Sequence, residues 1–130
     1  MSQQERNIEL VKKGYAAFAD GDVDTLMSLY DDAIEWTQPG DSAISGTYHG
    51  EAQLREFLGR LAERTTSVKA LRFLADDDTV VVLSEATVGG ETSQDVEVFT
   101  LRDGKAVRAR TFGDTALMER VYGTKKVAAG

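Results

Sequence analysis

Apolar residues recur at helical spacing in the first half of the chain and alternate at strand spacing in the second half. Spacings of three and four residues place an apolar stripe on each of three predicted helices, over about 4–19, 23–30 and 51–64. Gly21 is placed to end the first helix and Asp22 to cap the second. The stripes consist of Ile8, Val11, Tyr15 and Phe18, then Val23, Leu26, Met27 and Tyr30, then Leu54, Phe57, Leu58 and Leu61.

Period-two patterns dominate the second half. They predict four strands, at about 67–75, 79–88, 93–102 and 105–112. Turn signals separate these strands at Asp76–Asp78, Gly89-Gly90 and Asp103-Gly104, and such short links indicate antiparallel hairpins.

The middle of the chain and its end carry weaker signals. A short strand is predicted at 33–37, because Pro39-Gly40 stops it. Residues 41–50 are rich in Gly, Ser, Thr and Asp, which indicates a loop that can form a rim or lid. Asp114 is placed to cap a last helical turn, through Glu119 or Arg120, and the tail 124–130 is expected to be flexible.

Together these elements predict an α+β protein in which an antiparallel sheet packs on three helices of the N-terminal half. The 130 residues fit one domain, 1–130, with an ordered core over about 4–122.

Composition narrows the function classes. The formal net charge is −7 and the sequence pI is near 4.7. Nucleic acid is therefore not an expected partner, since phosphate contacts need clustered Lys and Arg. No segment approaches the roughly 20 apolar residues that span a bilayer, and the first ten residues do not resemble a signal peptide. The expected location is the cytoplasm, with no membrane contact. The chain contains no cysteine, which excludes disulfides and thiolate metal sites.

One carboxylate, Glu97, stands out among apolar strand positions. It shares a strand face with Phe99 and Leu101. A two-residue turn at Asp103-Gly104 would place it opposite Arg110 in a cross-strand ion pair, whereas a bulged turn would align it with Ala109 and Thr111. If its face is the concave one, burial raises its pKa and suits it to proton transfer. Both registers remain open from this pattern alone.

Several segments carry a resemblance to a known family. They are Tyr15–Phe18, Asp20–Asp24, Leu29–Asp32, Trp36, Pro39-Gly40, Tyr48–Gly50 and Phe99–Gly104. The chain resembles the SnoaL-like branch of the nuclear transport factor 2-like superfamily, which contains polyketide cyclases and ketosteroid isomerases. The resemblance covers nearly the whole chain. It implies a cone-shaped, cystatin-like fold, favours the bulged register, and suggests isomerase or cyclase chemistry without a cofactor on a small hydrophobic, carbonyl-bearing molecule, polyketide-like or steroid-like.

The acid and base positions of that family are only partly present. Anchored on Pro39, the isomerase base position holds Gln38, an amide that accepts no proton at neutral pH. The oxyanion tyrosine position falls on Gly14, one residue before Tyr15. The second carboxyl position holds Glu97, and the cyclase acid position at the end of the last strand holds Thr111. Two hypotheses therefore remain, an enzyme that uses Glu97 and a non-catalytic ligand-binding or dimerisation module.

The remaining site predictions concern ligand contacts and assembly. Glu97 is the candidate catalytic residue, and the candidate ligand-binding residues are Tyr15, Phe18, Trp36, Gln38, His49, Phe99 and Thr111. No metal site is expected, because one histidine without patterned carboxylates gives too few ligands. An outward sheet face is predicted to carry Val80, Val82, Val96 and Val98, and such an apolar face suggests a homodimer.

Overall fold

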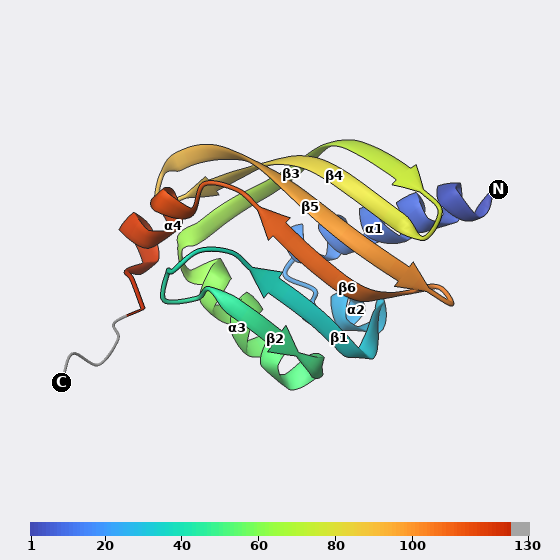
Figure 1. Cartoon of the computed structure of the whole chain (residues 1–130), viewed down its shortest axis with the longest axis horizontal. Helices are drawn as coiled ribbons and strands as arrows, with labels where there is room; N and C mark the ends of the chain where they lie inside the picture. Colours follow the sequence, from blue (N-terminus) through green and yellow to red (C-terminus); the bar gives the residue numbers. More distant parts are fainter. Residues whose placement is uncertain (126–130) are drawn as a thin grey trace.

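A six-stranded sheet and four helices make up the computed structural model, which describes residues 1–125 (Figure 1). The helices are α1 (Gln3–Ala19), α2 (Val23–Ser28), α3 (Gly50–Arg64) and α4 (Thr115–Tyr122). The strands are β1 (Tyr30–Gln38), β2 (Gly46–His49), β3 (Thr65–Asp76), β4 (Thr79–Val88), β5 (Glu91–Arg102) and β6 (Lys105–Phe112). The predicted α+β class and the helix-on-sheet arrangement are confirmed.

The two N-terminal helices follow from their caps. Ser2 and Glu5 form a reciprocal capping box that satisfies free N–H groups at the start of α1. Gly21 adopts a positive φ of 69°, and the Asp22 side chain then accepts the Thr25 N–H to begin α2. The second helix is shorter than its apolar stripe suggested. It ends at Ser28, so Tyr30 begins β1 and is not the last residue of that stripe.

The sheet order is β2-β1-β6-β5-β4-β3. All neighbours are antiparallel except β1 and β6, which run parallel. The all-antiparallel expectation is therefore wrong for this pair. The loop predicted over 41–50 is also partly wrong, because its end, Gly46–His49, pairs with β1 as the edge strand β2. Its polar, Gly-containing sequence is not typical of a strand, and this strand is paired along one side only.

The β5–β6 hairpin settles the register of Glu97. Asp103 and Gly104 both have positive φ, as a tight two-residue turn requires. The register then shifts by one residue after the Leu101–Ala106 pair, so that Val107 is an extra residue in β6. Glu97 consequently lies opposite Thr111. The predicted bulge exists, but it lies within the ladder and not in the turn.

Helices α1, α2 and α3 lie against one face of the curved sheet (Figure 1). The core between them centres on Trp36, whose ring packs against those of Phe57 and Phe99 at centroid distances of 6.0 and 6.1 Å. Leu54 and Phe57 of α3 are fully buried there. The helical stripes predicted from the sequence thus face the sheet.

The proposed outward valine face is half wrong. Val80 and Val82 are fully buried on the inner face, where Val82 pairs with Glu97. Val96 and Val98 do lie on the other face, opposite Leu83 and Val81 of β4. A slip of one residue in pairing reverses every side chain of a strand, and the sequence alone did not fix the pairing of β4 with β5.

Helix α4 covers one end of the sheet. Asp114 caps it by accepting the Leu117 N–H, and the helix continues to Tyr122, two or three residues beyond its predicted end. Leu117 is buried with Ala86 and Val88 in a small second cluster. Residues 126–130, most of the tail predicted to be flexible, lie outside the described residues. Within the part that is described, no helix has the length and hydropathy to cross a membrane.

Candidate functional site

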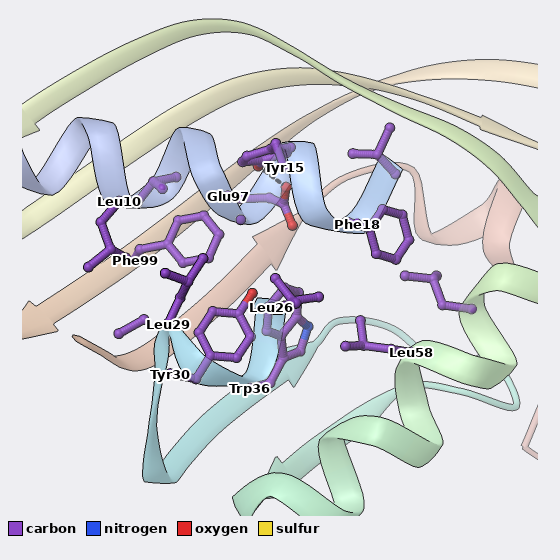
Figure 2. Close-up of a pocket in the computed structure, with 15 residues that line it drawn as sticks. Leu10, Tyr15, Phe18, Leu26, Leu29, Tyr30, Trp36, Leu58, Glu97 and Phe99 are labelled. Carbon is purple, nitrogen blue, oxygen red and sulfur yellow. Dashed lines mark hydrogen bonds between the residues drawn. The ribbon is translucent and has the colours of Figure 1, made fainter. Parts of the chain in front are cut away.

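Glu97 points from the middle of β5 toward the helices, into the interior of the fold (Figure 2). Each of its carboxyl oxygens accepts a hydrogen bond from a different hydroxyl. The Tyr15 hydroxyl of α1 donates to Oε1, and the Thr111 hydroxyl of β6 donates to Oε2 at 3.3 Å. Three of the predicted site residues therefore meet at one carboxyl group.

The surroundings of Glu97 favour its protonated form. Glu97 keeps some accessible surface because it borders internal cavities, yet the surrounding protein desolvates the carboxyl and raises its pKa. The negative charge of Asp95 raises the pKa further, while the hydrogen bonds from Tyr15 and Thr111 oppose the rise. Desolvation is the largest effect, so the net pKa of Glu97 is raised.

An apolar cavity of about 60 Å³ lies on one side of Glu97. Tyr15, Trp36 and Phe99 project into it from α1, β1 and β5 (Figure 2). Its wall is completed by Leu10, Val11, Gly14, Phe18, Leu26, Leu29, Tyr30, Leu58, Leu61, Val68 and Ala106. A carboxyl group is thus presented to a space that is otherwise almost entirely hydrocarbon and aromatic.

A second cavity of about 50 Å³ lies on the other side of Glu97, toward α4. Its wall is more polar and contains Gln38, Ser93, Asp95, Thr111, Asp114 and Thr115. Trp36, Leu61, Val68 and Glu97 border both cavities. Tyr15 borders only the apolar cavity and Thr111 only the polar one, so the two oxygens of Glu97 are held from the two cavities separately.

Asp95 is a site residue that the sequence analysis missed. It lies two residues before Glu97 on the same strand face, so period-two alternation alone would have found it. Burial raises its pKa, and hydrogen bonds from the Ser93 hydroxyl and the Asp114 backbone N–H limit the rise. Gly113 makes this position possible, because a Cβ there would lie 2.3 Å from Asp95 Oδ1.

Tyr30 was missed for a different reason. Its apolar spacing assigned it to a helix, but as the first residue of β1 it shares an inward face with Trp36 and Gln38. Its hydroxyl points toward the side of the apolar cavity where Glu97 lies (Figure 2). Burial and the charge of Glu97 raise the pKa of Tyr30, which therefore stays protonated and can donate a hydrogen bond.

The other predicted ligand-binding residues separate into two groups. Phe18, Trp36 and Phe99 border the apolar cavity, and Gln38 borders the polar one. His49 lies apart from both. It is exposed, precedes α3, and its backbone N–H donates to Gln53 Oε1 at 2.8 Å. Residues 1–125 contain no group of three or more His, Asp or Glu side chains placed to hold a metal ion.

The SnoaL-like domain matches residues 11–109, about three-quarters of the chain. The chain belongs to the SnoaL-like domain family. An uncharacterised protein of Mycobacterium tuberculosis is 28% identical over 100 residues, which is 77% of this chain and 68% of that protein.

Solved structures with a similar fold match this chain over nearly its whole length. Bal32a, from a soil-derived mobile gene cassette, superposes with a TM-score of 0.86 at 28% identity, over 93% of this chain and 99% of its own. TerC, co-crystallised with polyporic acid, gives a TM-score of 0.80 at 29% identity, over 92% and 99% of the two chains. Other neighbours carry nuclear transport factor 2-like and cystatin-like folds. The predicted superfamily is confirmed.

Within this SnoaL-like fold the chemistry available is proton transfer and hydrogen bonding. Among the described residues, the only carboxyl at the apolar cavity is that of Glu97, and its raised pKa makes it a stronger base than an ordinary carboxylate. Gly14 and Gln38, at the family positions of a tyrosine and an aspartate, both border a cavity but supply neither group. Tyr15, the residue after Gly14, directs its hydroxyl to Glu97.

Proposed function

We propose that this protein binds a small hydrophobic molecule with a carbonyl group in the apolar cavity, and that Glu97 transfers a proton on it. The observation that carries this proposal is the position of one carboxyl with a raised pKa, held by two hydroxyl groups, on the wall of a hydrocarbon cavity. SnoaL-like proteins commonly bind small hydrophobic ligands and include isomerases and cyclases, which agrees with this proposal.

The reaction proposed is enolisation, followed by return of the proton at another position or by ring closure. The Glu97 carboxylate takes a proton from the carbon next to the carbonyl, and the C–H electron pair moves into an enolate. Tyr15 and Thr111 donate to Glu97 and so fix its orientation. The Tyr30 hydroxyl, on the wall of the same cavity, donates to the enolate oxygen and stabilises the charge that develops there.

The cavity volumes set a condition on binding. Pockets for drug-sized molecules span about 300–1,000 Å³, whereas the two cavities measure about 60 and 50 Å³. A ligand of polyketide-like or steroid-like size therefore requires the two spaces to join and to widen, with Leu61 and Val68 of the shared wall moving aside while the packed Trp36 ring stays in place. Polyporic acid, the molecule co-crystallised with TerC, is a suitable first probe for such opening.

The test is exchange of carbon-bound hydrogen. Acetophenone in D₂O loses its methyl protons to solvent only through its enol, so proton NMR follows enolisation without a known substrate. We expect the protein to accelerate this exchange above the buffer rate and Glu97→Gln to abolish the acceleration. Glu56→Gln is the matched control, because Glu56 is exposed on α3 and borders neither cavity. Equal acceleration by Glu97→Gln would refute Glu97 as the proton carrier.

A non-catalytic ligand-binding module is the alternative function. The observation that favours it is Gln38, which places a neutral amide where the isomerase branch has its base. In this case Glu97 would only accept hydrogen bonds from a ligand. Binding of the probe without any faster hydrogen exchange in the wild-type protein would support the module and exclude the enzyme.

We also propose that two copies associate through the outer face of the sheet. Val81, Leu83, Val96 and Val98 form paired apolar neighbours there, and Leu74 and Phe112 extend the patch with exposed fractions of 42% and 46%. Arg110 and Glu85 lie on the same face. A twofold interface pairs this face with itself, which covers the apolar patch and can match the opposite charges.

A further inference from the structure

The indole N–H of Trp36 has no acceptor among the described residues. Trp36 is 6% exposed, and its Nε1 atom is fully enclosed. Nearly all buried N–H groups in proteins have a hydrogen-bond partner, and one that lacks a partner is costly. The Trp36 N–H is therefore a donor that the fold itself leaves unused.

Packing holds this donor in place. The Trp36 ring contacts the rings of Tyr30, Phe57 and Phe99 at centroid distances between 6.0 and 6.2 Å. These neighbours come from three different elements, β1, α3 and β5, so the indole cannot turn toward a protein acceptor without displacing the core. The direction of the N–H is thus set before any ligand arrives.

The position of Trp36 connects the donor to the cavities. It borders both the apolar and the polar cavity, and Glu97 is the only titratable residue that does the same among residues 1–125. Tyr30 and Trp36 rise from β1 on the wall facing α1, while Glu97 projects from β5 (Figure 2). A molecule that contacts Glu97 with one end and extends through both cavities therefore lies against the indole with another part.

We propose that the bound molecule carries a second hydrogen-bond acceptor, separate from the carbonyl at Glu97, and that Trp36 Nε1–H donates to it. The ligand class is a small, largely apolar, aromatic molecule with two acceptor atoms on different sides of the ring. This inference rests on the proposed ligand site, but not on proton transfer there. Trp36 acts as a specificity-determining residue.

Matched probes isolate the second acceptor. Acetophenone has one carbonyl, and 2-, 3- and 4-acetylpyridine keep its shape but replace one ring C–H by an acceptor nitrogen. We expect at least one acetylpyridine to bind about fivefold to tenfold more tightly than acetophenone at neutral pH, the size of one added hydrogen bond. Trp36→Phe keeps an aromatic ring without the N–H, and we expect it to bind the same acetylpyridine and acetophenone equally.

A direct readout needs no variant. Trp36 is the only tryptophan in the chain, so its indole N–H gives a single, unambiguous NMR cross-peak. We expect this peak to lie at the position of a free indole in the unliganded protein and to move downfield with the preferred acetylpyridine but not with acetophenone. This measurement decides the matter if Trp36→Phe does not fold.

The outcomes separate the two proposals. Binding of acetophenone with no tighter acetylpyridine, or a preference that survives in Trp36→Phe, overturns the role of Trp36 and leaves the proposed function intact. An indole peak already at a hydrogen-bonded position in the free protein, and unmoved by every probe, also overturns it, because water then satisfies the donor. A clear acetylpyridine preference without hydrogen exchange supports Trp36 and refutes the proposed enzyme. Binding of none of the four probes counts against both.

Discussion

Glu97 combines two requirements that oppose each other. A carboxyl that transfers protons near neutral pH needs a raised pKa, and here burial provides it. The same burial makes the ionised form unfavourable in the folded chain, so that part of the folding stability is lost whenever Glu97 is charged. The hydroxyls of Tyr15 and Thr111 reduce that loss, because they donate to the charged form.

A pH-dependent stability difference follows for Glu97→Gln. Between the ordinary carboxyl pKa of 4.5 and the raised pKa of Glu97, the folded chain binds more protons than the unfolded chain. The wild-type protein is therefore most stable at the acid side of this window and loses about 1.4 kcal/mol for each pH unit as the pH rises through it. The neutral amide introduced by Glu97→Gln removes this contribution, so the variant gains stability relative to the wild type as the pH rises.

Urea unfolding of both proteins across the pH range measures this difference, with Glu56→Gln on the exposed side of α3 as the control. The subtraction matters because the pKa of Asp95 is also raised and contributes in both proteins. A wild-type minus Glu97→Gln difference that is constant with pH would show that the pKa of Glu97 is not raised.

Removal of the Tyr15 hydroxyl tests the hydrogen bond itself. In Tyr15→Phe the Glu97 carboxylate loses a donor to its charged form, so its pKa rises above the wild-type value. Carboxyl carbon NMR of Glu97 over a pH titration gives this pKa. Tyr48→Phe is a matched control, because the Tyr48 hydroxyl donates to the Ile44 carbonyl at 2.7 Å. An unchanged or lower pKa in Tyr15→Phe would contradict the geometry.

For single residues of the candidate site, the sequence pattern indicated Glu97 more clearly than the residues that surround it in space. A lone acid among apolar strand positions is visible in the sequence, whereas the contact of Tyr15 with Glu97 joins residues 82 positions apart. Asp95 was within reach of the same alternation. Tyr30 was not, because a single aromatic residue between a helix and a strand fits either period.

Among the elements, β5, β6 and α4 together shape the polar cavity. The extra residue Val107 in β6 turns Thr111 toward Glu97, and Gly113 lets the chain pass close to Asp95 before Asp114 begins α4. The cap of a short helix therefore lies on the wall of the candidate site.

Two aspartate caps allow a matched comparison. Asp114→Ala and Asp22→Ala each remove an N-cap, so each is expected to lower the free energy of unfolding by about 1 kcal/mol. Only Asp114 borders the polar cavity. We therefore expect the side-chain amide NMR signals of Gln38 to move in Asp114→Ala and to stay in Asp22→Ala. Equal shifts in both variants would mean that the cap of α4 has no special link to the site.

The elements differ in how well the sequence predicts them. The helix α3 lies where its apolar stripe placed it, because amphipathic periodicity over many residues is a strong signal. The strand β2 has four residues and pairs on one side only, so its burial pattern is too short to distinguish it from a loop. The parallel pairing of β1 with β6 depends on contacts between chain segments about 70 residues apart, which no local pattern encodes.

At the scale of the whole molecule, the two faces of the sheet differ in the side chains that they present. The inner face supplies Glu97, Phe99 and Thr111 to the cavities, and the outer face presents a row of apolar side chains. The sequence indicated that an apolar outer face exists, yet it assigned Val80 and Val82 to that face, because both strands alternate valines and their relative register was unknown.

The outer face predicts the oligomeric state. We expect the wild-type protein to have the mass of a dimer by light scattering after size-exclusion chromatography. Leu83→Lys places a charge in the centre of the patch and is expected to give a monomer. Val23→Lys is the control, since Val23 is 38% exposed and Leu83 37%, but Val23 lies on α2. A wild-type monomer, or a Leu83→Lys dimer, would contradict the proposed interface.

The parallel pairing of β1 with β6 also determines when the binding site can form during synthesis. Trp36 and Tyr30 leave the ribosome early, but the strand that flanks β1 on the side of Glu97 is made last. Until β6 emerges, β1 and its early partner β2 have no connection to the β5-β4-β3 part of the sheet, and the apolar surface of the aromatic wall stays exposed to unwanted association. Nascent chains that stall before Lys105 should therefore be prone to aggregation, with a tryptophan that still reports an aqueous environment.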